Sequence, residues 1–526
     1  MADREREDPV LERRRAVLIG LALLCCYGYF FYLGGNWNVQ SRNAQIYALA
    51  EQGSLVIDEY PGLPEDGGDA AKYNGHYYSD KLIGPSLVAV PVYWAARRAL
   101  SAAGVDFRPA VYVALRITNF FVNAVPSALL AALLYLFLAE LGLSSGLRAW
   151  VTLAYGLGTL ALPYSTALFG HQFAAVCVGG AFMLLWQQRQ GWSAARGAAA
   201  GALAGLGAIS DFMALVIAFF LGLYVVWLAV GRAGRETRRV AVFALIAAAG
   251  AVGAGALADL GAISDLMALV TTFFLGLYVV WLAVGRAGIE AARARRETGR
   301  VAVFAVVAGL VLCVQLGANW ASFGGPFELA QAHHATLGAH HEAGFLGIGK
   351  PKLEALYQLT FGPYRGLFFG SPVLLLALPG LFLLGRKMRA EAIIIGAAWA
   401  TVLVINSGYA DWPAGTAYGP RYQIAAIPLL MIGAGEVARR APFMFKALTV
   451  ISIVVMVIVC AQNPFWIPVD VRNPLGAALG GFAAGDLEHA NVGMLIGLTG
   501  IVSLLPLVVV EAGLLYGLRL VRTRKQ

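Results

Sequence analysis

Charged residues are scarce in this sequence. Asp, Glu, Lys and Arg together make up 13% of its 526 residues, about half of the roughly 25% typical of soluble proteins. Apolar side chains make up 59%, and the mean hydropathy is +0.70. So little charge cannot coat a soluble globule of this size, which excludes a cytosolic enzyme and a disordered chain. The sequence therefore predicts an all-α, polytopic membrane protein.

Cysteine is also rare. The chain has five cysteines, and all of them lie in apolar runs, where cysteine behaves as a small hydrophobic residue. This excludes a secreted module held together by disulfides, and no disulfide or metal site is implied by them. These residues are Cys25, Cys26, Cys177, Cys313 and Cys460.

Fourteen apolar segments are predicted to cross a membrane, for which about 20 apolar residues suffice. The predicted crossings are 16–34, 109–140, 149–168, 171–187, 195–210, 212–230, 240–259, 266–284, 301–318, 366–384, 391–407, 422–438, 445–461 and 493–517.

The Lys and Arg content of the short loops between these crossings predicts which side of the membrane each loop faces. Arg13, Arg14 and Arg15 precede the first crossing, which has no small-residue cleavage site, so it is expected to be a retained anchor. Following the alternation, the later basic clusters fall on the same side as these arginines, which is expected to be cytoplasmic. The net charge of +9 then reflects topology and contact with anionic lipids, and no nucleic-acid partner is expected. We expect both termini in the cytoplasm and the chain in a bacterial plasma (inner) membrane.

This topology gives the chain a simple organisation. The long polar segments lie on the outer, periplasmic side, where any chemistry is expected. The predicted parts are a cytoplasmic N-terminus (1–15), the first crossing (16–34), an outer loop with interfacial helices (35–108), a transmembrane bundle (109–318), an outer loop (319–365), further crossings (366–461), an outer loop (462–492), and the last crossing with a basic tail (493–526).

A tandem duplication lies inside the bundle. Residues 206–234 recur at 260–288 with three changes in 29 positions, an offset of 54 residues. The duplicated units, about 195–247 and 248–308, each form a predicted helical hairpin, so copying one leaves the sidedness of later segments unchanged. Asp211 and Asp265 occupy equivalent outer ends of the two copies.

Four outer motifs carry a family resemblance. NGHYYSDKLIGPSL (74–87) resembles the NG..YFEKPPL signature of the aminoarabinose transferase of lipid A and, more loosely, a motif of protein O-mannosyltransferases. Both belong to the GT-C superfamily of polyprenyl-phosphate-sugar-dependent glycosyltransferases. The blocks WASFGGPFELAQAH, FGPYRGLFFGSPVLLLALPGL and DWPAGTAYGPRY are similar to those of bacterial family-39-type members. The resemblance implies a GT-C-like fold with a large first outer loop, and transfer of a sugar from a polyprenyl-phosphate donor to a lipid, glycan or protein acceptor.

The resemblance also suggests site residues. Lys81 matches the lysine that faces the lipid phosphate, and Asp80 takes the place of the glutamate beside it. Related enzymes carry a catalytic Asp after the first crossing, but here Asn38 stands there, and an amide cannot take a proton. Asp58 is therefore the first candidate base, followed by Asp69 and Asp80.

Other polar residues extend this predicted site. Arginines suit phosphate because the guanidinium binds it in a bidentate manner. The further candidates for donor phosphate binding are Arg116, Arg421, Arg365 and Arg42. The candidates for substrate contact are Asn38, Tyr78, His171, Asp411 and Trp412.

Histidines gather in the loop 319–365, at His333, His334, His340 and His341. Their spacing does not match a zinc motif. We expect no metal or other cofactor, with a divalent metal in this loop as the alternative.

Two other functions compete with glycosyl transfer. A transporter or flippase of a lipid-linked sugar predicts polar residues at the middle of the crossings, and here such residues concentrate at the outer edge. An inactive GT-C relative would explain Asn38. We expect membrane lipids to surround the protein whichever of these three functions it has.

Overall fold

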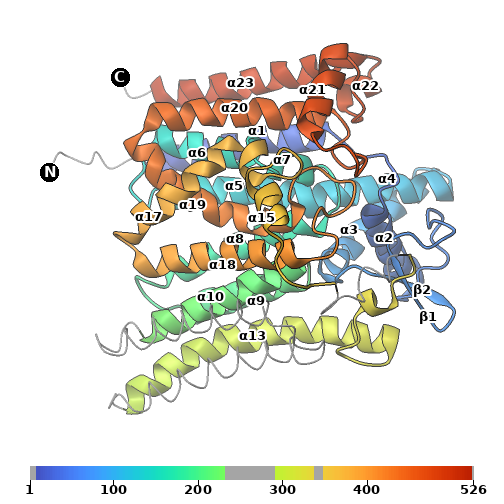
Figure 1. Ribbon diagram of the computed structural model, residues 1–526, viewed down its shortest axis with the longest axis horizontal. Helices are drawn as coiled ribbons and strands as arrows, with labels where there is room; N and C mark the ends of the chain where they lie inside the picture. The colour runs from blue at the N-terminus through green and yellow to red at the C-terminus, as the bar shows by residue number, and fades with distance from the viewer. Residues whose placement is uncertain (1–7, 231–290, 337–346, 524–526) are drawn as a thin grey trace.

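The computed structural model describes residues 8–230, 291–336 and 347–523. These parts are mostly helical, and the long helices run side by side along the longest axis of the molecule (Figure 1). Two of the predicted crossings, 240–259 and 266–284, and most of the second copy of the duplication lie outside the described residues.

The first half of the described chain contains helices α1 to α10 and one β-hairpin. Its elements are α1 (Pro9–Tyr29), α2 (Trp37–Tyr47), η1 (Ala48–Gln52), β1 (Ala70–Tyr73), β2 (His76–Ser79), α3 (Gly84–Ala102), α4 (Phe107–Asn119), η2 (Phe120–Ala124), α5 (Val125–Phe137), α6 (Ser145–Leu157), α7 (Ala161–Ser165), α8 (Gly170–Gln187), α9 (Ala194–Ala208) and α10 (Phe212–Val230).

The second half is helical throughout its regular elements. These are α13 (Ala291–Phe323), η3 (Ala330–His333), α15 (Leu353–Thr360), α16 (Leu367–Gly370), η4 (Pro372–Leu376), α17 (Ala377–Gly385), α18 (Arg389–Gly408), η5 (Arg421–Ala426), α19 (Ile427–Arg440), α20 (Pro442–Ala461), α21 (Pro474–Ala484), α22 (Val492–Leu495), η6 (Gly500–Leu504) and α23 (Leu505–Thr523).

Five helices of the described chain are long and apolar enough to cross a membrane. Each overlaps a predicted crossing, so the apolar runs predicted these helices correctly. They are Phe107–Phe137, Phe212–Ala229, Gly299–Phe323, Arg389–Gly408 and Pro442–Ala461. The total of fourteen crossings stays a prediction, and so does the interfacial position of α3, the helix that packs against α4.

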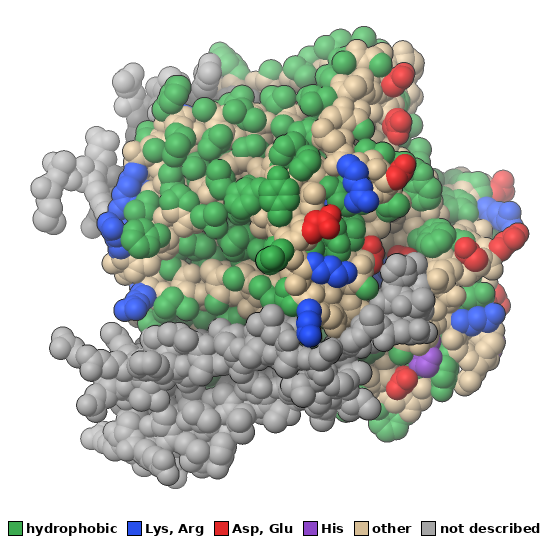
Figure 2. Space-filling view, viewed as in Figure 1, with side chains coloured by type: hydrophobic (Ala, Val, Ile, Leu, Met, Phe, Trp, Pro, Cys, Tyr) green, Lys and Arg blue, Asp and Glu red, His purple; other side chains and the backbone are tan. Residues whose placement is uncertain are grey.

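Charged side chains lie toward the two ends of the helix bundle. The C-terminal end of α23 lies at the left of Figure 1, whereas α2 and the β1–β2 hairpin lie at the opposite end. On the face shown in Figure 2, Lys and Arg side chains lie at the left edge and again toward the right, where Asp and Glu also lie, and much of the area between is hydrophobic. This pattern suits a bundle with an apolar belt and two polar ends.

The β-hairpin is a feature that the sequence analysis did not predict. β1 pairs with β2 in antiparallel register, with Ala70 opposite Ser79 and Tyr73 opposite His76. The connecting residues, Asn74 and Gly75, both have positive φ, at 50° and 86°. An Asn-Gly pair is the strongest short hairpin signal because both residues tolerate this conformation, so the signal was present in the sequence.

Two glycines allow the turn between α9 and α10 to pack closely against the outer segments. Gly84 donates its backbone N–H to the Ile209 carbonyl at 2.8 Å. A Cβ atom on Gly84 would lie 2.7 Å from that carbonyl oxygen, and one on Gly170 would clash with the carbonyl of Ser210. These contacts join the start of α3, the start of α8 and the turn that carries Asp211.

The first helix begins before its predicted start at residue 16, because the Asp8 side chain accepts a hydrogen bond from the backbone N–H of Val10 at 3.0 Å and caps the helix. Its first turn carries Glu12, which is buried. Glu12 accepts hydrogen bonds at 2.6 Å from Arg148 of α6 and at 2.6 Å from the hydroxyl of Tyr135 of α5. Arg148 is only 1% exposed, so this pair joins three helices through a buried charge.

We predict that Glu12→Leu destabilises the protein by about 3–5 kcal/mol, because it removes the carboxylate partner of a buried guanidinium. The double variant Glu12→Leu/Arg148→Met should be more stable than the single variant, since it removes both charges. Thermal unfolding in detergent checks both. A double variant as unstable as the sum of the two single variants would contradict the prediction.

Candidate functional site

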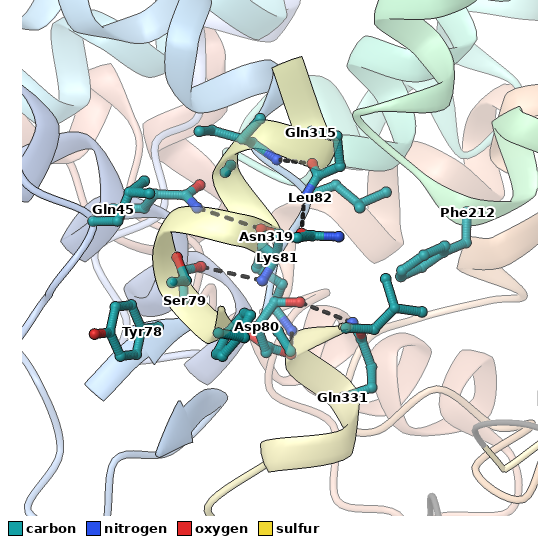
Figure 3. Close-up of a pocket in the computed structure, with 17 residues that line it drawn as sticks. Gln45, Tyr78, Ser79, Asp80, Lys81, Leu82, Phe212, Gln315, Asn319 and Gln331 are labelled. Carbon is teal, nitrogen blue, oxygen red and sulfur yellow. Dashed lines mark hydrogen bonds and ion pairs between the residues drawn. The ribbon is translucent and has the colours of Figure 1, made fainter. Parts of the chain in front are cut away.

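A pocket opens where the first outer segment meets α13. Its lining comes from α2 (Gln45), β2 and the following loop (Tyr78 to Ile83), the first residue of α10 (Phe212), α13 (Gln315 to Phe323), and residues 329–331. Figure 3 shows Asp80, Lys81 and Gln331 close together in this pocket.

Lys81 is the central charge of the pocket wall. Its Nζ donates to Asp69 Oδ2 at 2.7 Å and to Asp80 Oδ2 at 2.6 Å. Burial alone would raise the pKa of Asp69, but the ammonium of Lys81 more than offsets this and holds that pKa below its usual value. Asp80, predicted beside Lys81, and Asp69 are therefore both partners of this ammonium.

Polar groups from distant segments fix Asp80 in place. Ser41 of α2 donates to Asp80 Oδ1 at 3.0 Å, and Gln331 donates to the Asp80 backbone carbonyl at 2.9 Å. The Nε2 atom of His334 lies 3.7 Å from Asp80 Oδ2 and 4.0 Å from Asp69 Oδ1. The loop 319–365 thus contributes a buried histidine to the first outer segment.

Asp69, Asp80 and His334 each offer a possible metal ligand, and these three atoms lie within 4.8 Å of one another. Two carboxylates and an imidazole fit a divalent cation by type. Lys81, however, already places a positive charge between the carboxylates. A metal would have to displace that ammonium. Among the four histidines of the predicted loop, His333 instead lies 3.2 Å from Glu328, and residues 340 and 341 lie outside the described residues.

A second group of charges lies behind the pocket wall. Arg42 of α2 is 4% exposed and donates to the Leu82 carbonyl at 3.3 Å. Burial lowers the pKa of Arg42 to about 10, opposed by the charges of Asp80, Asp211 and Asp69 and assisted by that of Arg421. The charge of Arg42 therefore acts on the pocket carboxylates and on Arg421.

Arg421 begins η5 and is 8% exposed. Its guanidinium lies 5.8 Å from the ring centre of Phe169 and 5.5 Å from that of Tyr422. Its charge also acts on Asp69 in the pocket. Among the described residues, the Nε atoms of Arg42 and Arg421 have no hydrogen-bond partner. Because a buried N–H without a partner is costly, these two donors are available to an anion.

His171 is the second residue of α8 and contacts Asp211, the residue before α10. His171 Nδ1 and Asp211 Oδ2 are 2.8 Å apart, and each of the two residues is 6% exposed. Asp211 Oδ1 also accepts from the backbone N–H of Met213 at 2.9 Å. The sequence analysis named His171 as a contact residue but gave Asp211 no role, because 40 residues separate them and no motif joins them.

Three further predicted residues line or adjoin these groups. Tyr78 lies in the pocket wall with its ring 5.4 Å from that of Phe323. Asp411 accepts from the Gly415 N–H at 3.4 Å, and its charge acts on Arg421. Trp412 is half-buried and packs edge-on against Tyr364, with the ring centres 5.8 Å apart.

Other predicted residues have different neighbours. Arg116 is half-buried, and the ionisable groups that act on it are Tyr60 and Tyr32. Arg365 donates to the carbonyls of Pro413 and Gly415 at 2.9 and 2.8 Å, so it holds the loop before Arg421.

Asp58 and Asn38 also lie apart from the Lys81 contacts. Asp58 accepts from the Tyr77 N–H at 2.6 Å and lies 2.7 Å from His76 Nδ1, both on the hairpin. Asn38 is buried in the first turn of α2, where its backbone N–H donates to Asn36. Its side-chain oxygen has no partner among the described residues.

Removing the charge of Lys81 tests whether a divalent metal can bind to Asp69, Asp80 and His334. We predict that Lys81→Ala lets Asp69, Asp80 and His334 bind Mn²⁺, because the competing ammonium is gone, and that the wild-type protein binds it at least about 10-fold more weakly. Calorimetric titration with Mn²⁺ measures both affinities. His334→Ala in the Lys81→Ala background is the control and should remove the new site. Tight binding to the wild type, lost in His334→Ala, would contradict the prediction.

Comparison with known proteins identifies no family. No family model matches the sequence, and no curated protein matches it. Two crystal structures of the oligosaccharyltransferase of Archaeoglobus fulgidus are similar in structure, one in complex with Zn and sulfate and the other in the apo form. Identity is 13% for both, the TM-scores are 0.39 and 0.40, and 91% of this chain is covered. The match covers 54% and 57% of those chains, so this chain spans little more than half their length.

Proposed function

We propose that this chain is a GT-C-type glycosyltransferase that moves a sugar from a polyprenyl-phosphate donor to an acceptor hydroxyl at the outer face of a bacterial plasma membrane. One observation carries the proposal: three cations from separate segments gather at one end of an apolar helix bundle. They are Lys81 after the hairpin, which contacts Asp69 and Asp80, Arg42 on α2, whose charge acts on both carboxylates, and Arg421 on η5, whose charge acts on Asp69.

These cations suit a phosphate that leaves in the reaction. Cleavage of the bond between the sugar and the phosphate puts negative charge on the phosphate oxygen, and fixed cations stabilise that charge in the transition state. Arg42 and Arg421 each have a buried N–H donor without a partner among the described residues. Lys81 would exchange one of its two carboxylate partners for a phosphate oxygen. The gain is larger here than in water because the surroundings are poorly polarisable.

The position in the fold suits a lipid-linked donor. The pocket lies at the hairpin end of the bundle, next to helices of membrane-spanning length. A polyprenyl chain is apolar and can remain in the bilayer while its charged head reaches the pocket. The predicted basic clusters on the opposite side support a periplasmic location of this end and therefore an outer-face reaction.

Arg116 and Arg365 have weaker support as donor ligands. Arg365 uses two of its N–H groups on backbone carbonyls, and the ionisable groups near Arg116 are tyrosines. We retain Lys81, Arg42 and Arg421 as the proposed phosphate ligands, with Tyr78, Asp411 and Trp412 around them as proposed contacts to the sugar or the acceptor.

The three carboxylates predicted as bases all have strong partners. Asp69 and Asp80 each accept from Lys81, and Asp58 accepts from the hairpin backbone. For Asp69, the Lys81 ammonium lowers the pKa, so this carboxylate binds a proton less readily. Either of the pocket carboxylates becomes a better base only if Lys81 leaves it for the phosphate.

Lys81→Met should lower transfer of labelled sugar from undecaprenyl-phosphate hexoses to membrane acceptors by about 100-fold or more, the scale expected for removing one charge-stabilising group. Lys72→Met is the matched control: Lys72 is exposed on the same hairpin, and its loss should leave the rate unchanged. The transfer is measured in nanodiscs after folding has been checked by thermal unfolding. Equal rates for the two folded variants would refute the role of Lys81.

Arg421→Gln should likewise lower transfer by about 100-fold and weaken binding of undecaprenyl phosphate, because the donor loses a buried cation. The control is Arg472→Gln, since Arg472 is exposed and only packs over the ring of Tyr364 at 5.0 Å. Thermal-shift titration with undecaprenyl phosphate measures binding. If wild-type protein neither binds this lipid nor transfers any hexose from it, the proposed function is wrong.

A further inference from the structure

The buried pair His171 and Asp211 has the geometry of an oriented proton acceptor. The Nδ1 atom of His171 lies 2.8 Å from Asp211 Oδ2, and both residues are more than nine-tenths buried. Since a carboxylate only accepts hydrogen bonds, the ring proton of a neutral His171 lies on Nδ1. The lone pair is then on Nε2.

The Nε2 atom of His171 is buried and has no hydrogen-bond partner among the described residues. Buried polar atoms usually have partners, so this nitrogen has the capacity to accept a hydrogen bond from a bound molecule. The group that satisfies a neutral imidazole lone pair is a hydrogen-bond donor such as a hydroxyl. In the proposed reaction, the hydroxyl group of the molecule that accepts the sugar is such a hydrogen-bond donor.

Charged and aromatic groups surround the ring of His171 on several sides. Asp211 lies before α10, Arg42 comes from α2, and Arg421 and Tyr422 come from η5. Tyr164 of α7 lies edge-on to the ring, with centres 6.3 Å apart. The two arginines are the same residues that present unpartnered Nε donors. A hydroxyl at Nε2 would thus lie beside groups suited to the donor phosphate.

We propose that His171, oriented by Asp211, is the general base that takes the proton of the acceptor hydroxyl. This rests on the proposed function. The acceptor O–H bond breaks as its proton moves to Nε2, and the oxygen forms a bond to the anomeric carbon. The bond between that carbon and the phosphate oxygen breaks, and the phosphate leaves with the electron pair toward Arg421 and Arg42. The proton then passes from His171 to the departing phosphate or to water.

The proposal accounts for the amide at position 38. Asn38 stands where the resembled enzymes are expected to have an acid, and it cannot accept a proton. The candidate acids Asp69, Asp80 and Asp58 accept hydrogen bonds from Lys81 or the hairpin. Nε2 of His171 has no such competitor among the described groups. Asp211 is a positioning residue, because it holds the ring and fixes the tautomer.

The packing around the pair fixes its geometry. Gly170 lies directly before His171, and a side chain there would clash with the Ser210 carbonyl and with Arg42 Nη2. Gly84 contacts the same turn from α3. The close approach of these backbones sets Asp211 beside the ring.

The duplication provides a matched control for Asp211. Asp265 stands at the equivalent position in the second copy. Asp211→Asn should lower kcat by about 100-fold with little change in KM for the donor, whereas Asp265→Asn should leave turnover unchanged. The reverse result would overturn the assignment of Asp211.

The base itself is tested with His171→Ala in nanodiscs, using undecaprenyl-phosphate hexoses as donor. We expect transfer to fall at least about 1,000-fold while thermal-shift binding of undecaprenyl phosphate persists. Added imidazole should restore part of the rate, and the restored rate should rise with pH as imidazole loses its proton. His333→Gln is the control, because His333 pairs with Glu328 outside this group.

The outcomes separate the two proposals. If the wild type transfers sugar and His171→Ala does so with the same rate and pH profile, His171 is not the base, but the proposed glycosyltransferase function is unaffected. A folded His171→Ala that binds the lipid, loses transfer and shows no rescue would assign the pair to structure and also overturn the base. Loss of transfer in Asp58→Asn, with His171→Ala active, would return the role to Asp58. Failure of the wild type with every donor would overturn the proposed function itself.

Discussion

Every buried charge in this apolar bundle needs a partner, and this requirement shapes both of its ends. Glu12 and Arg148 satisfy each other, together with Tyr135, and join α1, α5 and α6. At the hairpin end, Lys81 contacts two carboxylates, and the Nε atoms of Arg42 and Arg421 have no hydrogen-bond partner among the described residues. The first group joins three helices and stabilises the fold, whereas the second contains the cations that we propose as phosphate ligands.

In the proposed reaction, a charge-balanced pocket would allow a charged head group to be both bound and released. Lys81 already contacts two carboxylates, so binding a phosphate would exchange one partner for another and would not release the full energy of a new buried ion pair. After release of the phosphate, the displaced carboxylate would contact the ammonium again, so that the cation would remain paired.

The sequence predicted the long apolar helices well, because hydropathy over about 20 residues depends only on local composition. Lys81, Asp80, His171 and Arg421 were named from the sequence as candidate site residues. Their partners could not be predicted, because these contacts join segments far apart in the chain, such as Gln331 with Asp80 across 251 residues. The hairpin differs, because its Asn74-Gly75 turn is a local signal that the sequence contains.

Arg365 and Arg421 show why a residue type in a loop does not define its role. Both arginines follow a Gly-Pro pair closely in the sequence, and both are buried. Arg365 donates to the carbonyls of Pro413 and Gly415, whereas the Nε atom of Arg421 has no partner among the described residues. The first arginine fixes the loop that leads to the second. Because that loop is held from outside the site, Arg421 can keep an open donor without collapse of the backbone around it, which is the condition for a pre-organised anion site.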